Sequence, residues 1–311
     1  EASVLTHGTI WGNGTINVVK GQRDNPIGNA NATPTGYYVR KYIPETILSD
    51  NHGGSSPRLW TFIRYAEIMM NYAEAMNENG LYIAALKFPE NAFYNETEIK
   101  GKINLAPYEI IPFILAKCRN LNEVRALLSE TEIIALPFSD NLPLSPLHWH
   151  IADKSGSLVL EKTTDGMHIY ENPANVLTNN PPFPFHLQNT IHYQNLSSEN
   201  PNIYEKKMLG LGTVGLVGDF TPASRFVRAD YLLKNTPEDC IDANHFFHIL
   251  DNVAIPKGAV RTPDGKYHYT SYSCCFDAEK LILYYRIYDC FHVEEMPLTT
   301  EGNNLAVKEY H

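Results

Sequence analysis

Residues 218–228 read GDFTPASRFVR and lead into a predicted helix over residues 224–233. A second helix is predicted over residues 243–250, with His245 and His248 on one face. As metal ligands these two histidines lack a third partner nearby, and the apolar residues around them favour a packing role. This part of the sequence therefore predicts helical structure without a metal site.

The segment just before this stretch is rich in glycine. Residues 210–215 read GLGTVG, which matches the fingerprint of dinucleotide-binding loops. No predicted strand precedes it and no helix opens from it, so a phosphate site is the minor alternative. The favoured interpretation is a glycine-rich loop that lets the backbone approach a substrate closely.

The segments from residue 81 onwards mix strand and helix patterns. Strands are predicted at residues 81–88, 147–152, 157–161, 167–170, 175–178, 267–274 and 281–288, and helices at residues 110–118 and 121–128. Asn120, with Glu123 three residues later, matches a capping box for the second of these helices. Residues 179–201, rich in Pro and Asn, are predicted to be a long functional loop. The mixed order predicts an α+β architecture in which helices cover sheet faces.

The first part of the sequence has a different character. In residues 1–56, short β-prone runs lie between turn signals such as Asn13-Gly14. Residues 58–78 carry apolar side chains at spacings of three and four, which predicts a helix with one apolar face. Gly80 is predicted to end this helix in the left-handed conformation.

Composition excludes several classes of partner. The net charge is −10 and no run of Lys and Arg occurs, which argues against nucleic acid or an anionic membrane surface as a partner. No apolar stretch approaches the length of a membrane span. Five cysteines, two of them adjacent, predict a reduced set rather than a disulfide framework. There is no CxxC pair for zinc, and we expect no cofactor.

Several separate segments resemble one family. They are residues 77–81 (NENGL), 142–149 (LPLSPLHW), 176–181 (VLTNNP), 218–228 (GDFTPASRFVR) and 246–250 (FFHIL). Together they resemble the choloylglycine hydrolase family, which comprises conjugated bile salt hydrolases and penicillin V acylases, over residues 76–311. The resemblance implies an N-terminal nucleophile hydrolase with a four-layer αββα sandwich. It also implies hydrolysis of the amide bond of glycine- or taurine-conjugated bile salts, and it admits a homotetramer.

The chemistry that the resemblance implies uses a cysteine at the first position of the mature chain. Its α-amino group is the general base for its own thiol, which attacks the amide carbonyl and forms a thioester that water hydrolyses. The present sequence begins with Glu1-Ala2-Ser3. We therefore expect an incomplete sandwich, without the nucleophile and the first strands of the family, and an inactive chain.

Three site residues are carried over from the resemblance. Asn179 matches the asparagine whose side chain contributes to the oxyanion hole, and Arg225 matches an arginine near the nucleophile. Lys87 lies at a further oxyanion-hole position, where bile salt hydrolases carry Asn and penicillin V acylases carry Tyr, so substrate preference stays open. We expect Asn179 and Arg225 to face a cleft edged by Leu142, Phe183 and residues 210–215, with no thiol pointing into it.

Residues 35–43 (TGYYVRKYI) and 60–75 (WTFIRYAEIMMNYAEA) resemble a different family. They are similar to part of the SusD/RagB family, outer-membrane lipoproteins that bind glycans. We therefore predict a SusD/RagB-like fragment over residues 1–78, a short irregular β segment plus helix, and a choloylglycine hydrolase-like domain over residues 79–311. Glycan binding and a chimeric chain without a selected function are the alternatives. The expected location is the cytoplasm, or the periplasm or outer membrane if the first part decides it.

Overall fold

The structure is a computed structural model that describes residues 74–138, 142–201 and 210–297, together with four short strands nearer the N-terminus. By its contacts the chain forms two compact units, Glu1–Arg64 with Thr300–His311, and Tyr65–Thr299. In the first unit, β1 (Val4–Leu5) pairs antiparallel with β4 (Tyr38–Val39), and β2 (Ile10–Trp11) with β3 (Gly14–Thr15). The predicted domain boundary after residue 78 stays a prediction.

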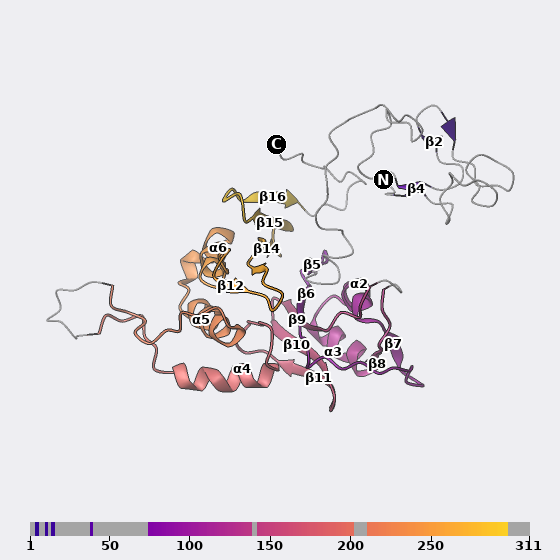
Figure 1. Cartoon of the computed structure of the whole chain (residues 1–311), viewed down its shortest axis with the longest axis horizontal. Helices are drawn as coiled ribbons and strands as arrows, with labels where there is room; N and C mark the ends of the chain where they lie inside the picture. Colours follow the sequence, from indigo (N-terminus) through magenta and orange to yellow (C-terminus); the bar gives the residue numbers. More distant parts are fainter. Residues whose placement is uncertain are drawn as a thin grey trace. The chain divides into compact units, whose positions relative to one another are not determined.

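The second unit is built around a five-stranded antiparallel sheet (Figure 1). Its order is β11-β10-β9-β6-β5, formed by Gly166–Glu171, Gly156–Thr163, Leu147–Asp153, Tyr82–Lys87 and Glu74–Met76. β10 reads GSLVLEKT and is buried on both faces over most of its length. Alternate residues of β10 therefore contact different layers of the fold, as the twofold period of a strand requires.

The end of the helix predicted over residues 58–78 is wrong, because Glu74–Met76 is strand β5. Residues 58–73 lie outside the described residues. β5 pairs with β6 through a tight turn, in which Asn77 Oδ1 accepts from the backbone N–H groups of Asn79 and Leu81. Gly80 has the predicted positive φ, 77°, but it serves this turn rather than a helix end. Pairing with a neighbouring strand has overridden the local helical pattern.

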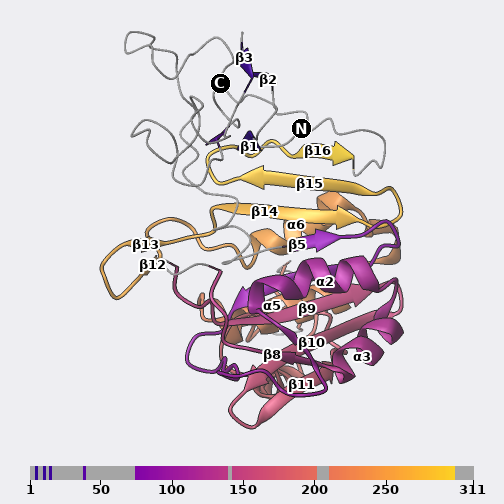
Figure 2. The ribbon, with the colours of Figure 1, turned by 90° about the vertical axis from the view of Figure 1, so that its right-hand side faces the viewer.

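Two helices cover one face of the sheet (Figure 2). They are α2 (Ile110–Lys117), preceded by the 3₁₀ turn η1 (Pro107–Glu109), and α3 (Leu121–Ser129). Half of the predicted capping box is confirmed, since Glu123 N donates to Asn120 Oδ1 at 3.0 Å. The Glu123 carboxylate accepts from the backbone N–H of Arg119 rather than from that of Asn120. A short parallel pair, β7 (Ile103–Leu105) and β8 (Thr131–Ile133), flanks these helices. The larger core lies here, where fully buried residues such as Ile114 and Trp149 meet.

The opposite face of the sheet carries α4 (Phe183–Thr190) and α5 (Pro222–Lys234). A second core of Val159, Ala174, Val176, Phe183 and Phe226 joins them to β10. Two predictions are wrong here. Residues 175–178 are not a strand, because Asn175 has a φ of 53° that breaks an extended run. Residues 179–201 are not one loop, since they contain α4 and the 3₁₀ turn η2 (Ile191–Tyr193).

A second sheet lies beyond the β5 edge of the first (Figure 2). It is the antiparallel order β14-β15-β16, Tyr272–Asp277, Ile282–Ile287 and Glu294–Pro297. Phe276 in β14 meets Tyr82 in β6 with ring centroids 5.6 Å apart, and α6 (Ala243–Asp251) contacts β14. Helices thus lie on both faces of the first sheet, and the described part is mixed α and β, as expected. The predicted strand over 267–274 is divided between two sheets, because β13 (Tyr267–His268) pairs with β12 (Val260–Arg261) and only the later residues belong to β14. The 3₁₀ turn η3 (Glu238–Cys240) precedes α6.

Candidate active site

Asn179 links the two other predicted site residues, Lys87 and Arg225. Its Nδ2 donates to the backbone carbonyl oxygen of Lys87 at 2.8 Å. Its Oδ1 accepts from Arg225 Nη2 at 3.0 Å. A guanidinium can only donate and a carbonyl can only accept, so these partners fix which end of the amide is nitrogen. We call Lys87, Asn179 and Arg225 the polar corner.

Lys87 ends β6, and its backbone groups point away from β9. The N–H of Phe88 donates to the carbonyl oxygen of Pro146 at 2.9 Å, so these two residues form a hydrogen-bonded pair. Lys87 and Leu147 are the next pair, and bonded and non-bonded pairs alternate along an antiparallel ladder. The N–H and C=O of Lys87 therefore both project from the other edge of β6, where the carbonyl meets Asn179.

Arg225 is held at the start of α5. Thr221 caps this helix by accepting from the N–H of Ser224, and Pro222 is suited to the first turn because its missing N–H needs no partner there. Arg225 Nε donates to the carbonyl oxygen of Phe220 at 3.2 Å. Hydrogen bonds to the backbone and to Asn179 thus orient the guanidinium.

The loop before α5 is fixed by its own polar contacts. Arg228, which is buried, donates from Nη1 to the carbonyl oxygens of Val217 and Asp219, and from Nε to that of Asn252. Hydrogen bonds from Thr221, then Ser224, lower the pKa of Asp219 to about 2. Asp219 is therefore a carboxylate at neutral pH and a stable acceptor at the helix start.

The segment that carries Asn179 is anchored on both sides. Thr178 Oγ1 donates to the carbonyl oxygen of Pro222 at 2.9 Å, which ties the segment to α5. His186 Nε2 lies 2.8 Å from the carbonyl oxygen of Asn179, and since a carbonyl only accepts, Nε2 carries the proton. The His186 ring stacks on Phe226 with centroids 4.9 Å apart. The backbone of Asn179 is thus held as well as its side chain.

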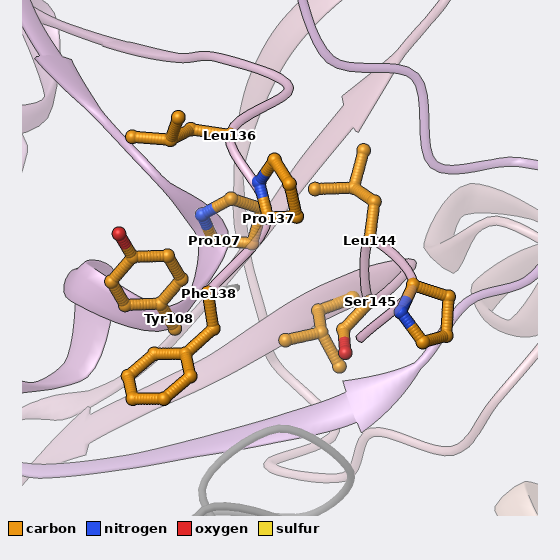
Figure 3. Close-up of a pocket in the computed structure, with 9 residues that line it drawn as sticks. Pro107, Tyr108, Leu136, Pro137, Phe138, Leu144 and Ser145 are labelled. Carbon is orange, nitrogen blue, oxygen red and sulfur yellow. The ribbon is translucent and has the colours of Figure 1, made fainter. Parts of the chain in front are cut away.

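An apolar hollow lies near this end of β6 and β9 (Figure 3). It is lined by Pro107, Tyr108, Leu136, Pro137, Phe138, Pro143, Leu144, Ser145 and Leu147. The rings of Tyr108 and Phe138 meet edge to face, with centroids 5.2 Å apart. Leu147 is the register partner of Lys87, so the hollow and the polar corner share one end of the strand pair.

None of the predicted cleft walls, Leu142, Phe183 and residues 210–215, lines this hollow. Phe183 is fully buried in the second core and edges no cleft. Leu142 does not line the hollow, although its neighbours Pro143 and Leu144 do. The close backbone approach expected at residues 210–215 is made within the chain, because a Cβ on Gly212 would lie 2.5 Å from the carbonyl oxygen of Ser198.

The five cysteines lie on elements other than those of the polar corner. Cys118 follows α2, Cys240 ends η3, Cys274 and Cys275 lie in β14, and Cys290 follows β15. Burial, and then the Glu123 carboxylate, raises the pKa of Cys118. Desolvation, and then Asp239, raises the pKa of Cys240. Nucleophilic cysteines have lowered pKa values, so neither thiol is activated.

The described part of the chain contains neither a metal-ligand cluster nor a membrane-spanning helix. Within residues 74–138, 142–201 and 210–297, no group of three or more His, Cys, Asp or Glu side chains is arranged to hold a metal ion. His245 Nε2 lies 3.2 Å from Thr236 Oγ1 instead. The same ranges contain no helix long and apolar enough to cross a membrane.

Comparison with known families decides the assignment. The model of the choloylglycine hydrolase family, linear amide C-N hydrolases, matches residues 61–309. This chain belongs to the choloylglycine hydrolase family. The family consists of linear amide C-N hydrolases. The polar corner of this chain lies within the matched region.

Individual proteins similar to this chain in sequence or in structure support the same family assignment. It is 40% identical over 240 residues to a bile salt hydrolase/transferase of Lactiplantibacillus plantarum, covering 74% of each chain. The structure is similar to that of a mutant of the conjugated bile acid hydrolase from Clostridium perfringens, with a TM-score of 0.71, 37% identity and 77% of each chain covered. A penicillin V acylase from Agrobacterium tumefaciens shares the fold, with a TM-score of 0.56, 22% identity, and coverage of 75% of this chain and 68% of the acylase.

The first part of the chain has a separate likeness. A model of the SusD family matches residues 1–89 and overlaps the start of the choloylglycine hydrolase match. Both family resemblances found in the sequence are therefore confirmed. The SusD match covers the smaller share of the chain.

Sequence reasoning missed a group of buried polar residues behind the polar corner. Glu161, His148 and His186 are all fully buried. The sequence placed Glu161 only in a strand, and His148 only in a strand and a family segment. The available signal was a carboxylate directly after the apolar run LVL (residues 158–160) of β10, since buried carboxylates need partners.

Proposed function

We propose that this chain recognises the amide group of glycine- or taurine-conjugated bile salts at the polar corner. The observation that carries the proposal is the contact of Asn179 with both Lys87 and Arg225. The amide nitrogen of Asn179 has two N–H groups, and one is used on Lys87. The second, with the backbone N–H of Lys87, would donate to the carbonyl oxygen of the scissile amide.

Such an arrangement suits amide hydrolysis. Attack on an amide carbonyl turns its oxygen into an anion, and two fixed N–H donors stabilise that anion more than the starting carbonyl. Arg225 supports this role by holding the oxygen end of the Asn179 amide, which keeps the nitrogen end turned towards Lys87. The roles of these three residues rest on this geometry and on the family to which the chain belongs.

The apolar hollow supports an amphipathic substrate. A conjugated bile salt joins an apolar ring system to an anionic glycine or taurine through one amide. The hollow would contact the apolar body while the amide lies at the polar corner, since both share one end of β6 and β9. Lys87 is exposed and brings a positive charge to the side where the anionic group would lie.

We infer that the described residues do not by themselves complete the hydrolysis. The reaction needs a nucleophile at the polar corner, and the five cysteines lie on other elements. Losing the nucleophile of such a unit costs on the order of a millionfold in rate. The proposal is therefore a chain that binds conjugated bile salts and hydrolyses them too slowly to detect.

Two measurements on the purified chain test this proposal. Taurocholate binding is followed by calorimetry, and taurine release by an amine-reactive dye. We expect saturable binding, weaker in Asn179→Asp, which keeps the acceptor for Arg225 but loses the donor. Asn195→Asp, an exposed change of the same kind, should bind as the parent chain does. Absence of binding would refute the proposed recognition, and taurine release that iodoacetamide abolishes would refute the proposed inactivity.

Glycan binding by residues 1–78 is a second candidate, supported by the match of residues 1–89 to the SusD family. Saturable binding to starch that taurocholate does not displace would support it, and absence of binding to a glycan panel would exclude it.

We place the hydrolase-like part in the cytoplasm, as a homotetramer. Fractionation and light scattering test these two assignments, and a periplasmic or outer-membrane fraction would favour the SusD-like part as the determinant.

A further inference from the structure

Glu161 is a fully buried carboxylate in the middle of the fold. On β10, Leu160 directly before it belongs to the larger apolar core, and Val159, two positions before it, belongs to the second core. Burying a charge is costly, and an apolar residue of similar size in such a place is often neutral or stabilising. A carboxylate at this position therefore requires an explanation other than stability.

The contacts of Glu161 lead to the polar corner. Its Oε1 lies 3.0 Å from His148 Nδ1 and accepts from the N–H of Phe183 at 3.0 Å. Phe183 begins α4 and follows the segment that carries Asn179. His186, one turn further along α4, is bonded to the carbonyl oxygen of Asn179. Glu161 thus holds the start of the helix whose next turn holds Asn179.

The partner histidine connects the same carboxylate to Lys87. The ring of His148 is stacked on Phe88, with centroids 4.3 Å apart and an interplanar angle of 5°. Phe88 directly follows Lys87, and His148 pairs across the ladder with Leu86, directly before it. Glu161 therefore contacts, through one neighbour each, the segments on both sides of the Lys87–Asn179 hydrogen bond.

We propose that Glu161 is a positioning residue that sets the geometry of Asn179 against Lys87. It acts through His148 on one side, and through the start of α4 at Phe183, the helix that carries His186, on the other. The proposal rests on the function proposed for the polar corner, since that function gives the geometry its purpose. Glu161 itself touches none of the three residues. Its effect would be to keep the donors of Lys87 and Asn179 facing the same point.

The test compares two substitutions of Glu161 with a matched control. Glu161→Met keeps the length of the side chain but removes the acceptor, whereas Glu161→Gln restores one. The control is Glu132→Gln, which alters another largely buried carboxylate, on β8. Its partner at 3.3 Å, Lys162, follows Glu161 in β10, so its side chain lies on the opposite face of that strand. The readout is the side-chain amide NMR signal of Asn179, identified by its loss in Asn179→Asp, together with taurocholate affinity.

We expect Glu161→Met to shift the Asn179 signal and to weaken taurocholate binding about tenfold or more, and Glu161→Gln to restore both to within about threefold. Glu132→Gln should lower stability without moving the signal. A folded Glu161→Met protein with an unmoved Asn179 signal would overturn the proposal, as would an equal shift in the control. The NMR signal needs no ligand, so it decides the matter even if taurocholate does not bind.

If Glu161→Met does not fold, His148→Phe replaces it in the test. This change removes one of the two hydrogen bonds of the carboxylate and keeps an aromatic ring against Phe88. We expect a smaller shift of the Asn179 signal in the same direction. An unmoved signal in the folded His148→Phe protein would overturn the proposal.

Discussion

The guanidinium of Arg225 donates to the side-chain oxygen of Asn179 at 3.0 Å, although 46 positions separate the two residues in the sequence. The contact joins α5 to the segment before α4. It therefore makes the orientation of the Asn179 amide a property of the tertiary fold.

Removing the guanidinium should release the Asn179 amide. We expect Arg225→Gln to weaken taurocholate binding about tenfold to a hundredfold, because a hydrogen bond to a charged group contributes about 1.5–3 kcal/mol. Isothermal titration calorimetry measures the change. Arg125→Gln is the control, since Arg125 pairs with Glu171 at the surface. Equal affinities of the Arg225→Gln and parent proteins would show that Arg225 does not orient Asn179.

Gly212 should be intolerant of any side chain. A Cβ there would lie 2.5 Å from the backbone oxygen of Ser198, whereas a Cβ on Gly218 would meet nothing within 4 Å. We expect Gly212→Ala to lower the free energy of unfolding by about 1–3 kcal/mol, and Gly218→Ala to change it by less than about 0.5 kcal/mol. Urea unfolding of both variants gives the comparison, and equal stabilities would contradict the contact.

Stability should fall on mild acidification. Burial, and then the charge of His148, lowers the pKa of His150 to about 4, and burial lowers the pKa values of His148 and His186. As the pH falls, these histidines bind protons in the unfolded chain before they do so in the folded one. The stability that comes from keeping them neutral is therefore present above pH 6.5 and is lost towards pH 4. We expect His150→Gln to reduce the loss by about 2–3 kcal/mol. Urea unfolding at pH 7 and 4.5 measures it, with exposed His192→Gln as the control; parallel losses in both variants would be evidence against the lowered pKa.

The cysteines should react as ordinary or protected thiols. Cys290 is exposed, whereas Cys118 is buried and its pKa is raised by burial and Glu123. We expect iodoacetamide to label Cys290 first and Cys118 only after unfolding, as followed by peptide mass spectrometry. Rapid labelling of any cysteine at pH 6 would reveal an activated thiolate and would contradict the proposed inactivity.

Elements with local determinants could be predicted from the sequence. α2 and α3 each carry apolar residues that pack on the sheet. α3 also has a cap whose donor and acceptor lie three residues apart. β5 could not be predicted, because its conformation is set by pairing with β6. α4 was hidden by its proline-rich start, and the N–H of Phe183 finds its acceptor on Glu161 of a distant strand.

The candidate site divides in the same way. Asn179 and Arg225 could be named from their similarity to a family, and their mutual approach was expected and is present. Glu161 could not be assigned a role from the sequence, because which strand residues face α4 depends on sheet register. The apolar hollow is likewise formed by segments around Pro107, Leu136 and Leu144, which only the fold brings together.

The central claim is that the polar corner donates hydrogen bonds to the amide carbonyl of a conjugated bile salt. The most direct measurement is the ¹³C chemical shift of taurocholate labelled at its amide carbonyl carbon, free and bound. We predict a downfield shift on binding, reduced in Asn179→Asp and unchanged in Asn195→Asp. Bound taurocholate whose carbonyl shift is the same as in free solution, or is unaffected by Asn179→Asp, would contradict the claim.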